Sequence, residues 1–456
     1  MKQQSAPPLA RNDDVVLTVD SLGSEGQGVG RYEGFAVFVP GALPGETVHT
    51  HIIKVTSSYA VGKLTGIAVQ SPQRVAPSCP LFSRCGGCSL QHMDYEAQLL
   101  YKQKVASDAF KRLGGFNDVV VAKTLGMENP WHYRNKGSFP FANMNGVVET
   151  GFFAQRSHRI VPLEACPIEQ ESAILVALAV RQWARECGIS VYEEESHKGI
   201  LRHAMARIAS DGGVMAVVVT TGALPQAQKL VSLLKSKVPN LKSIIHNINS
   251  AQTNVILGSR YQTLWGDERI EHTLCGLAFS VSAASFLQVN TEQTEKLYET
   301  ALAYLNPQGN ETVADVYCGI GTISLMLAKR ARRVIGIENV PQAVEDAKHN
   351  AEKNRIKNAE FLCGNAETVL PALVKDGIRL DAAIVDPPRK GCEEAALKAI
   401  AESGVNRLVY VSCNPSTLAR DCRTLTELGF EINSVQPVDM FPQTEHVETI
   451  ALMLKM

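Results

Sequence analysis

The chain has 456 residues, too many for a single hydrophobic core, so we expect two or three domains. Hydrophobic residues make up 45% of it, but no apolar run approaches the roughly 20 residues that span a bilayer, and the N-terminus lacks the apolar segment of a secretory signal. We therefore expect a cytoplasmic protein without a membrane partner, and the net charge of −1 neither supports nor excludes nucleic-acid binding.

The first predicted domain is a small β-barrel. After a predicted N-terminal tail at residues 1–10, short runs rich in β-branched residues are separated by turns such as GSEGQGVG at residues 23–30. Several short strands at regular spacing are typical of a barrel of about 60 residues. We place this domain at residues 11–72.

The second predicted domain, residues 73–272, mixes strands and helices without a clean repeat, so we interpret it as α+β. A helix predicted within residues 94–116 ends at a pair of glycines. Ahead of it lies a cysteine group, with Cys79, Cys85 and Cys88 in the spacing C-x5-C-x2-C and Cys166 as a distant fourth member. Because disulfides are rare in the cytoplasm, this spacing predicts a metal site, for which zinc is the ordinary choice.

The third predicted domain, residues 273–456, alternates strands and helices. The first clear strand lies in TVADVYCG at residues 312–319, and the chain closes with extended runs at residues 431–441 and 446–455. Strands that alternate with helices indicate a parallel, doubly wound sheet. The predicted fold is therefore multidomain, with a β-barrel, an α+β middle domain and a C-terminal α/β domain of the Rossmann-like kind.

A nucleotide-type site is predicted at the start of this α/β domain. The sequence DVYCGIGT at residues 315–322 places glycines between a strand and a helix, where the backbone can approach a ligand closely. Glu338 ends the next strand and fits the acidic residue that holds ribose hydroxyls. Because the third glycine of the dinucleotide fingerprint is missing, a phosphate-free adenosine ligand such as S-adenosylmethionine fits best.

Asp386 and Cys413 each follow a predicted strand and should therefore lie at the same crevice of the sheet. Asp386 opens DPPRKG, a rigid segment similar to the Asn/Asp-Pro-Pro-aromatic motif of amino-group methyltransferases, but Arg389 replaces the aromatic residue. A buried structural cysteine would lie inside the apolar run, whereas Cys413 stands at its end.

A methyl donor beside a thiol favours methylation of the uracil C5 carbon. That carbon is a poor nucleophile until a thiolate adds to C6, after which a base must remove the C5 proton. A free thiol near pKa 8.5 is ionised by a few per cent, so the site should lower the pKa or provide a proton acceptor. The helix that begins near Ser416 is predicted to lower it. Glu448 is the candidate base, with His446 and Glu445 as competitors.

Together these motifs resemble the RNA 5-methyluridine methyltransferase family of the TrmA/RumA type. The matching segments are DPPRKG, LVYVSCNPST, HVET and SFLQVN, at residues 386–391, 408–417, 446–449 and 285–290. The resemblance covers essentially the whole chain. It is strongest to the TRAM-containing bacterial 23S rRNA (uracil-C5) methyltransferases of the RlmD/RlmCD kind, which also share YRNKGSF and HNIN, at residues 133–139 and 246–249.

The resemblance implies roles for individual residues. Cys413 would be the nucleophile and Glu448 the base, and Arg134 and Lys136 would hold RNA phosphates. The N-terminal barrel would be a TRAM domain, an RNA-binding barrel of the OB-like kind. The residues implied to contact S-adenosylmethionine are Gln288, Tyr317, Glu338, Asn365 and Asp386. The residues implied to bind a closed [4Fe–4S] cluster, with no role in methyl transfer, are Cys79, Cys85, Cys88 and Cys166.

We therefore predict a monomeric enzyme that methylates C5 of one or more uridines in 23S rRNA, with RNA as its partner. Three alternatives remain open at this stage. They are a tRNA 5-methyluridine methyltransferase, a methyltransferase acting on an exocyclic amine through the Asp-Pro-Pro-Arg segment alone, and a non-catalytic RNA-binding or chaperone protein.

Overall fold

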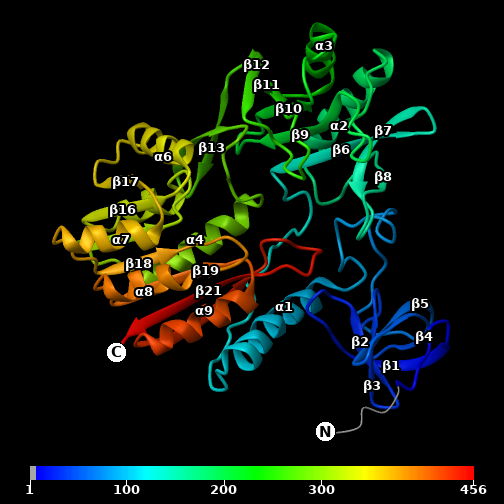
Figure 1. The fold of residues 1–456 in the computed structure, drawn as a ribbon, viewed down its shortest axis with the longest axis horizontal. Coiled ribbons are helices and arrows are strands. Elements are labelled where there is room, and N and C mark those ends of the chain that lie inside the picture. Colours follow the sequence, from blue (N-terminus) through cyan, green and yellow to red (C-terminus); the bar gives the residue numbers. More distant parts are fainter. Residues whose placement is uncertain (1–6) are drawn as a thin grey trace.

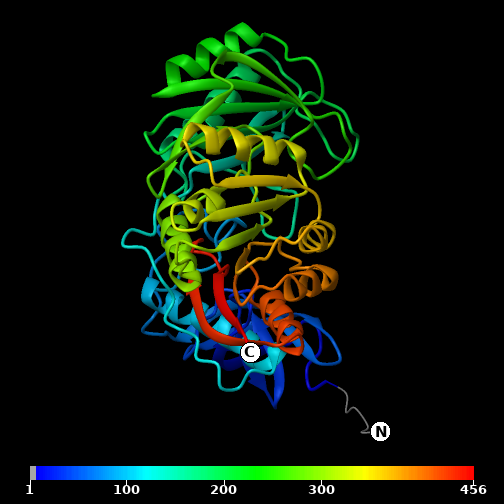
Figure 2. The ribbon, with the colours of Figure 1, turned by 90° about the vertical axis from the view of Figure 1, so that its left-hand side faces the viewer.

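The computed structural model describes residues 7–456, so the first six residues of the predicted N-terminal tail lie outside the described part. The chain forms a small barrel, a middle sheet and a C-terminal sheet (Figure 1). Viewed from the side, the middle sheet lies at the opposite end of the molecule from the barrel (Figure 2). No helix within residues 7–456 has the length and apolar character needed to span a membrane.

The N-terminal barrel is closed in the order β1-β2-β3-β5-β4. Its strands are β1 (Asp14–Leu22), β2 (Gly28–Tyr32), β3 (Phe35–Val39), β4 (Thr47–Val55) and β5 (Tyr59–Val69). Val15, Leu17 and Val19 of β1 point into the barrel and alternate with exposed residues, as a strand with one buried face requires. The predicted barrel is confirmed.

A helix after the cysteine group leads away from the barrel. Helix α1 (Tyr95–Ala109) begins where the Asp94 carboxylate accepts a hydrogen bond from the Ala97 N–H at 2.9 Å. It continues through a π-helical turn, η1 (Phe110–Gly114), and ends at Gly115, whose φ of +79° suits glycine. The helix packs on helix α9 (Pro415–Glu427) and strand β20 (Phe430–Val438) of the C-terminal sheet.

The middle sheet has seven strands in the order β12-β11-β10-β9-β6-β7-β8. The strands are β6 (Lys136–Met144), β7 (Val147–Phe153), β8 (Ile160–Pro162), β9 (Leu201–Ile208), β10 (Val214–Thr220), β11 (Leu241–Ile248) and β12 (Arg260–Gly266). Helices α2 (Glu171–Glu186) and α3 (Ala227–Lys237) cover one face, where Trp183 is fully buried. The hairpin of β13 (Arg269–Leu274) and β14 (Leu277–Ser282) adjoins the other face.

The C-terminal sheet has seven strands in the order β17-β16-β15-β18-β19-β21-β20. They are β15 (Thr312–Val316), β16 (Arg333–Glu338), β17 (Ala359–Cys363), β18 (Ala382–Val385), β19 (Arg407–Ser412), β20 and β21 (Glu448–Lys455). The strands from β15 to β19 are parallel, whereas β21 inserts antiparallel between β19 and β20. The predicted doubly wound sheet is confirmed.

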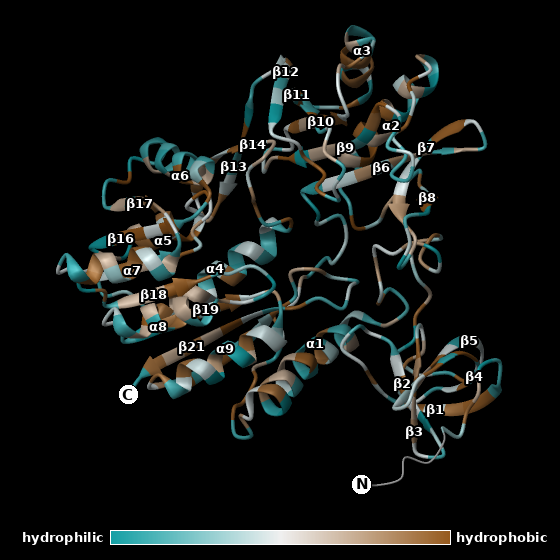
Figure 3. Ribbon diagram, viewed as in Figure 1, coloured by the Kyte–Doolittle hydropathy of each residue, from teal (hydrophilic) through white to brown (hydrophobic). Residues whose placement is uncertain are grey.

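Helices cover both faces of this sheet, while its central strands are apolar (Figure 3). One face carries α4 (Thr291–Leu305), α5 (Thr322–Ala328) and α6 (Pro341–Lys353). The other carries α7 (Ala366–Lys375), α8 (Glu394–Glu402), α9 and α1. With both faces covered, the edge at the carboxyl ends of the parallel strands is the place for a ligand site.

Candidate active site

The turn after β15 has the backbone geometry of a ligand-binding turn. Gly319 and Gly321 have φ angles of +55° and +84°, which side chains disfavour, and α5 begins directly after Gly321. Tyr317 also has a positive φ, +69°. The Glu338 carboxylate, at the end of β16, accepts hydrogen bonds from the N–H groups of Gly319 at 3.1 Å and Val340 at 2.8 Å. Glu338 therefore holds the turn as well as facing the cavity beside it.

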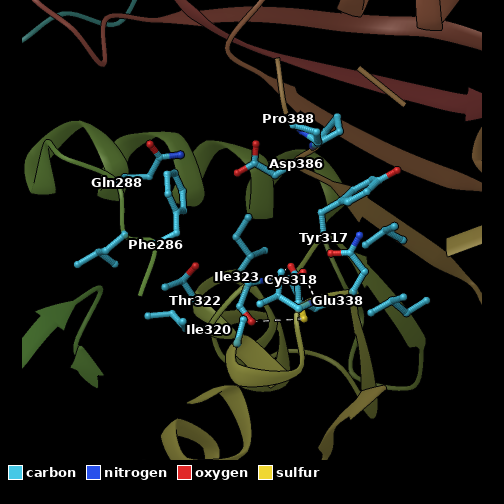
Figure 4. Close-up of a pocket in the computed structure, with 18 of the residues that line it drawn as sticks. Phe286, Gln288, Tyr317, Cys318, Ile320, Thr322, Ile323, Glu338, Asp386 and Pro388 are labelled. Carbon is cyan, nitrogen blue, oxygen red and sulfur yellow. Dashed lines mark hydrogen bonds between the residues drawn. The ribbon is translucent and has the colours of Figure 1, made fainter. Parts of the chain in front are cut away.

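One cavity of about 980 Å³ opens at this edge of the sheet. In Figure 4, Gln288 and Phe286 lie on one side of it, Tyr317 and Glu338 on the other, and Asp386 between them. The structure thus brings together all the cofactor and catalytic residues predicted from the sequence. These lining residues are Gln288, Tyr317, Glu338, Asn365, Asp386, Cys413 and Glu448.

Strand pairing explains how Cys413 and Glu448 meet. Ser412, the last residue of β19, pairs with Thr449 of the antiparallel strand β21. The next position is Cys413 on one strand and Glu448 on the other, and the charge of Glu448 acts on the Cys413 thiol. Asp386 follows β18, the other neighbour of β19. Three strand ends therefore place a thiol between two carboxyl groups.

Two carboxyl groups of the cavity, Asp386 and Glu448, resist ionisation. Burial raises the pKa of both Asp386 and Glu448, and the charge of Asp386 raises that of Glu448 further. Burial also raises the pKa of Asp315, below the cavity in β15, to about 7. One oxygen of Glu448, Oε2, has no hydrogen-bond partner within residues 7–456. Such a group can take up or release a proton near neutral pH.

The expected lowering of the Cys413 pKa is wrong. Although α9 begins two residues later, burial and the nearby Glu448 raise the pKa of the Cys413 thiol to about 11, and the charge of Arg389 opposes this only in part. The physical reason is that desolvation of a half-buried thiolate, together with a neighbouring negative charge, outweighs a single helix end. The remaining possibility is a proton acceptor, which the two carboxyl groups provide.

Comparison with known proteins identifies the family. Residues 229–456 match the family model of tRNA (uracil-5-)-methyltransferases, and residues 13–65 match the TRAM domain. The chain is 47% identical to an uncharacterized RNA methyltransferase of Halalkalibacterium halodurans, with 99% of each chain covered. It is 46% identical to another from Clostridium tetani, over 98% of this chain and 97% of the relative. The chain belongs to the uracil-5 RNA methyltransferases.

A solved structure agrees with this assignment. The tRNA (uracil-54, C5)-methyltransferase of Pyrococcus abyssi, in complex with S-adenosyl-L-homocysteine, matches with a TM-score of 0.77 and 27% sequence identity. The match covers 96% of this chain and 100% of that one. This uracil-5 RNA methyltransferase is therefore a class I enzyme that uses S-adenosylmethionine, and the resemblance, fold class and enzyme class predicted from the sequence are confirmed.

Glu445 and His446, the two competing candidates for the base, lie in surroundings that differ from those of Glu448. The Glu445 carboxylate accepts a hydrogen bond from the Ser89 hydroxyl at 2.6 Å. The His446 side chain is 42% exposed, and burial lowers its pKa. Glu448, unlike His446, is buried, with only 2% of its surface exposed. The reason is that β21 lies between two other strands.

Phe286 is a cavity residue that the sequence analysis did not single out. Its side chain lines the cavity although the residue is 69% exposed, which is unusual for a large aromatic residue. The segment SFLQVN contains it two positions before Gln288. An aromatic residue in a loop next to a predicted cofactor contact was the available signal.

The four predicted metal ligands of the methyltransferase lie near one another, but their side chains are not arranged around a common metal position. Cys88 is influenced by the charges of Cys166, Cys85 and Cys79, after burial as the main cause, and its pKa is raised to about 12. Within residues 7–456, however, no three or more His, Cys, Asp or Glu side chains are arranged to hold a metal ion. The donor chemistry therefore fits a metal cluster, whereas the arrangement of the side chains is not that of a closed metal site.

The two predicted phosphate ligands have unequal surroundings. Arg134 donates a hydrogen bond from Nε to the buried Glu169 carboxylate at 2.9 Å, so its charge is already compensated. Lys136 lies opposite Arg207 in the pairing of β6 and β9. Burial and the charges of Arg207 and Arg134 lower the pKa of Lys136 to about 8. Of the two, Lys136 is the better candidate to receive an anion.

Proposed function

We propose that this enzyme methylates C5 of a uridine in 23S rRNA through a covalent bond between Cys413 and C6 of the base. The observation that carries the proposal is that Cys413, Asp386 and Glu448 line the cavity formed at the glycine turn. A class I methyltransferase acting on an amine has no need of a thiol between two carboxyl groups. Uracil C5 does need one, because C5 is not nucleophilic until C6 carries a substituent.

The chemical steps balance as follows. The Cys413 sulfur forms a bond to C6, and the electrons of the C5–C6 double bond shift to give an enolate at O4. C5 then takes the methyl group from the sulfonium of S-adenosylmethionine, which leaves as the neutral thioether. Glu448 removes the proton from C5, the C5–C6 double bond re-forms, and the Cys413 sulfur leaves C6 as a thiolate.

The proton of the Cys413 thiol must be transferred before the first step. A thiol with a pKa of about 11 is ionised at pH 7 in roughly one molecule in ten thousand. The positive charge of Arg389 favours the ionised forms of both Cys413 and Glu448. We propose that Arg389 stabilises the thiolate and that Asp386 receives its proton, so that Glu448 is free to take the proton from C5 later.

We propose that the donor lies against Gln288, Tyr317, Glu338, Asn365 and Asp386. The Glu338 carboxylate supplies acceptors for ribose hydroxyls, and the positive φ angles of the turn let the backbone approach closely. Phe286, exposed at the cavity, would stack on the uracil once that base has left its own stack. S-Adenosylmethionine supplies the methyl group when it is bound there.

We also propose that Cys79, Cys85, Cys88 and Cys166 hold a [4Fe–4S] cluster. Support comes from the proximity of Cys88 to Cys166, Cys85 and Cys79, whose negative charges oppose ionisation of the Cys88 thiol. Four thiolates need a compensating positive charge, which a cluster supplies. We assign the cluster a structural role near the RNA and no step of methyl transfer. An assay for iron and acid-labile sulfide, with Cys88→Ser as the control, tests this part separately.

The most specific part of the proposal is which RNA carries the target uridine. The match to a TRAM domain supports an RNA substrate, and the motifs shared with the rRNA branch support 23S rRNA. We propose that the enzyme acts as a monomer. A tRNA target is the second candidate, because the similar Pyrococcus abyssi enzyme is named for uridine 54 of tRNA. Mass-spectrometric mapping of 5-methyluridine in rRNA and tRNA from cells lacking this protein decides between them.

The mechanism is tested with RNA that carries 5-fluorouridine at the mapped site. Fluorine cannot leave as a proton, so we expect a methylated covalent complex to accumulate. Cys413→Ala should form none of this complex while it still binds S-adenosylmethionine. A Cys413→Ala protein that forms the complex would remove the nucleophile assignment, and a methyl group found on an exocyclic amine would remove the uracil C5 proposal.

A further inference from the structure

The loop that leads into Glu448 is held from outside the C-terminal sheet. This base loop, residues 439–447, joins β20 to β21, and its two ends adjoin because Val438 pairs with Glu448. Asp439 and Met440 are fully buried, although they lie in a loop. Phe441 of the base loop lines the cavity together with Glu448. The conformation of the loop therefore affects the position of the proposed base.

Helix α1 supplies the first set of contacts. The Lys102 ammonium group forms an ion pair with Asp439, in which both side chains are fully buried, and it also donates to the carbonyl of Phe441 at 3.0 Å. The Tyr95 hydroxyl donates to the same Asp439 carboxylate at 2.8 Å. Charged groups are buried only where they are paired, so this contact fixes the start of the loop strongly.

The segment that carries the cysteine group supplies the second set of contacts. The N–H groups of Ser89 and Leu90 both donate to the carbonyl of Gln443 at 3.0 Å. The Ser89 hydroxyl donates to the Glu445 carboxylate at 2.6 Å and accepts from the Glu445 N–H at 3.0 Å. Since Ser89 follows Cys88 directly, the cysteine segment and the base loop are in continuous contact.

We propose that Ser89 and Lys102 are positioning residues, which hold the base loop so that Glu448 can reach the proton on C5. The inference rests on the proposed function of Glu448 and deepens it, because it links the proton-removal step to the cysteine segment and to α1. It also identifies a task for the segment that precedes α1, which lies outside the cavity itself. A base displaced by about 1 Å loses much of its efficiency.

The contacts predict an effect on one step. Cys413 follows β19, which is hydrogen-bonded to β18 and β21 and receives none of the contacts from Ser89 or Lys102 described above. Loss of the contacts that Ser89 or Lys102 makes with the base loop should therefore leave attack on C6 and methyl transfer nearly unchanged. Removal of the C5 proton should become slower, so that the enzyme accumulates as the methylated covalent complex with ordinary RNA.

The test compares Ser89→Ala with Ser83→Ala, a change of an exposed serine in the same segment. Two measurements are needed, namely the rate of complex formation with 5-fluorouridine RNA and the rate of release of methylated product from ordinary RNA. Because Ser89→Ala removes a hydrogen bond to a charged group, we expect release to slow about tenfold while complex formation stays within about twofold of the unmodified enzyme. Ser83→Ala should change neither rate.

A second variant covers the buried ion pair. Lys102→Met alone would leave Asp439 charged and unpaired, so Lys102→Met is combined with Asp439→Asn, and binding of S-adenosylmethionine verifies folding. Lys104→Met, an exposed position on the same helix, is the control. We again expect slower release with normal complex formation.

Two outcomes overturn the inference. If the variants lose thermal stability but keep the release rate of the unmodified enzyme, the contacts of Ser89 and Lys102 with the base loop serve stability only. If both rates fall together, the loop does not act on the base specifically. Failure of the proposed function gives a different result, because the unmodified enzyme would then form no complex with 5-fluorouridine RNA.

Discussion

The cation-paired sites of this methyltransferase, at the base loop and in the barrel, bury carboxyl groups in the opposite way to the cavity. At the junction of α1 with the base loop, Asp439 is fully buried beside the ammonium group of Lys102. In the barrel, the fully buried Glu46 receives hydrogen bonds from the Arg74 guanidinium group. In the cavity, burial raises the pKa of Asp386 and Glu448, and the charge of Arg389 does not offset this for Glu448.

The difference shows which buried charges serve stability and which serve chemistry. A carboxylate with a cation at hydrogen-bond distance stays ionised and holds two segments together. Carboxyl groups without such a partner destabilise the ligand-free protein once they ionise, but they can exchange protons near neutral pH. They also leave the cavity suited to a substrate that brings its own positive charge, as the sulfonium of S-adenosylmethionine does.

The largest expected effect comes from Glu448→Gln. Gln has nearly the same shape but cannot accept the C5 proton, so turnover should fall by about 10²- to 10⁴-fold. The methylated RNA should stay bound to Cys413, visible as a complex that survives denaturing electrophoresis. Unimpaired turnover would assign the base elsewhere, and the same experiment on His446→Gln tests the first competitor.

Loss of the cation from a paired carboxylate should lower the stability of the protein instead of its activity. Arg74→Met leaves the Glu46 carboxylate buried without its cation, and we expect the barrel to lose about 3–5 kcal/mol. Hydrogen exchange of the amides in β1–β5 measures this loss. The double variant Arg74→Met/Glu46→Gln should recover part of it, because no uncompensated charge remains. A loss below about 1 kcal/mol in the single variant would contradict the distinction between the two regions.

The cavity should make stability depend on pH. In the folded protein the pKa of Glu448 lies above its unfolded value, so its contribution to stability is complete below about pH 4 and declines as pH rises through the folded pKa. We therefore expect the ligand-free enzyme to lose stability from mildly acidic to mildly alkaline pH. Glu448→Gln should show a flatter dependence in thermal unfolding. An equally steep curve for both proteins would show that Glu448 does not retain its proton.

The smallest effect is expected on the surface of α1. Lys104 pairs with Asp108 at 3.0 Å, but their side chains are 54% and 34% exposed. Solvent screens such pairs, so Lys104→Met should change the free energy of unfolding by less than about 0.5 kcal/mol. Denaturant unfolding of this variant sets the baseline for the other changes. A larger loss of stability would mean that exposed and buried ion pairs contribute to the free energy of unfolding of this protein to a similar extent.

Much of the site could be predicted from the sequence because the information is local. Glycines between a strand and a helix, and polar residues directly after strands, lie at one edge of any parallel sheet. That rule predicts that Glu338, Asp386 and Cys413 lie together, and all three line the cavity, as does Tyr317, which the family resemblance implied. Glu448, by contrast, was one of three candidate bases, with His446 and Glu445, and the resemblance to a family favoured it, since a residue that begins a final strand has no determined neighbour.

Three further features were decided by the tertiary structure alone. The order β19-β21-β20 places Glu448 next to Cys413, and such pairing joins segments whose separation along the chain carries no signal. The ionisation of Cys413 depends on burial and on charges from other strands, which is why a prediction based on one helix end was wrong. The third feature is the packing of α1 on the C-terminal sheet, which also depends on contacts between segments far apart in the sequence. Sequence determines which groups the chain carries and which strand ends expose them, whereas non-local packing determines the neighbours that set their charge.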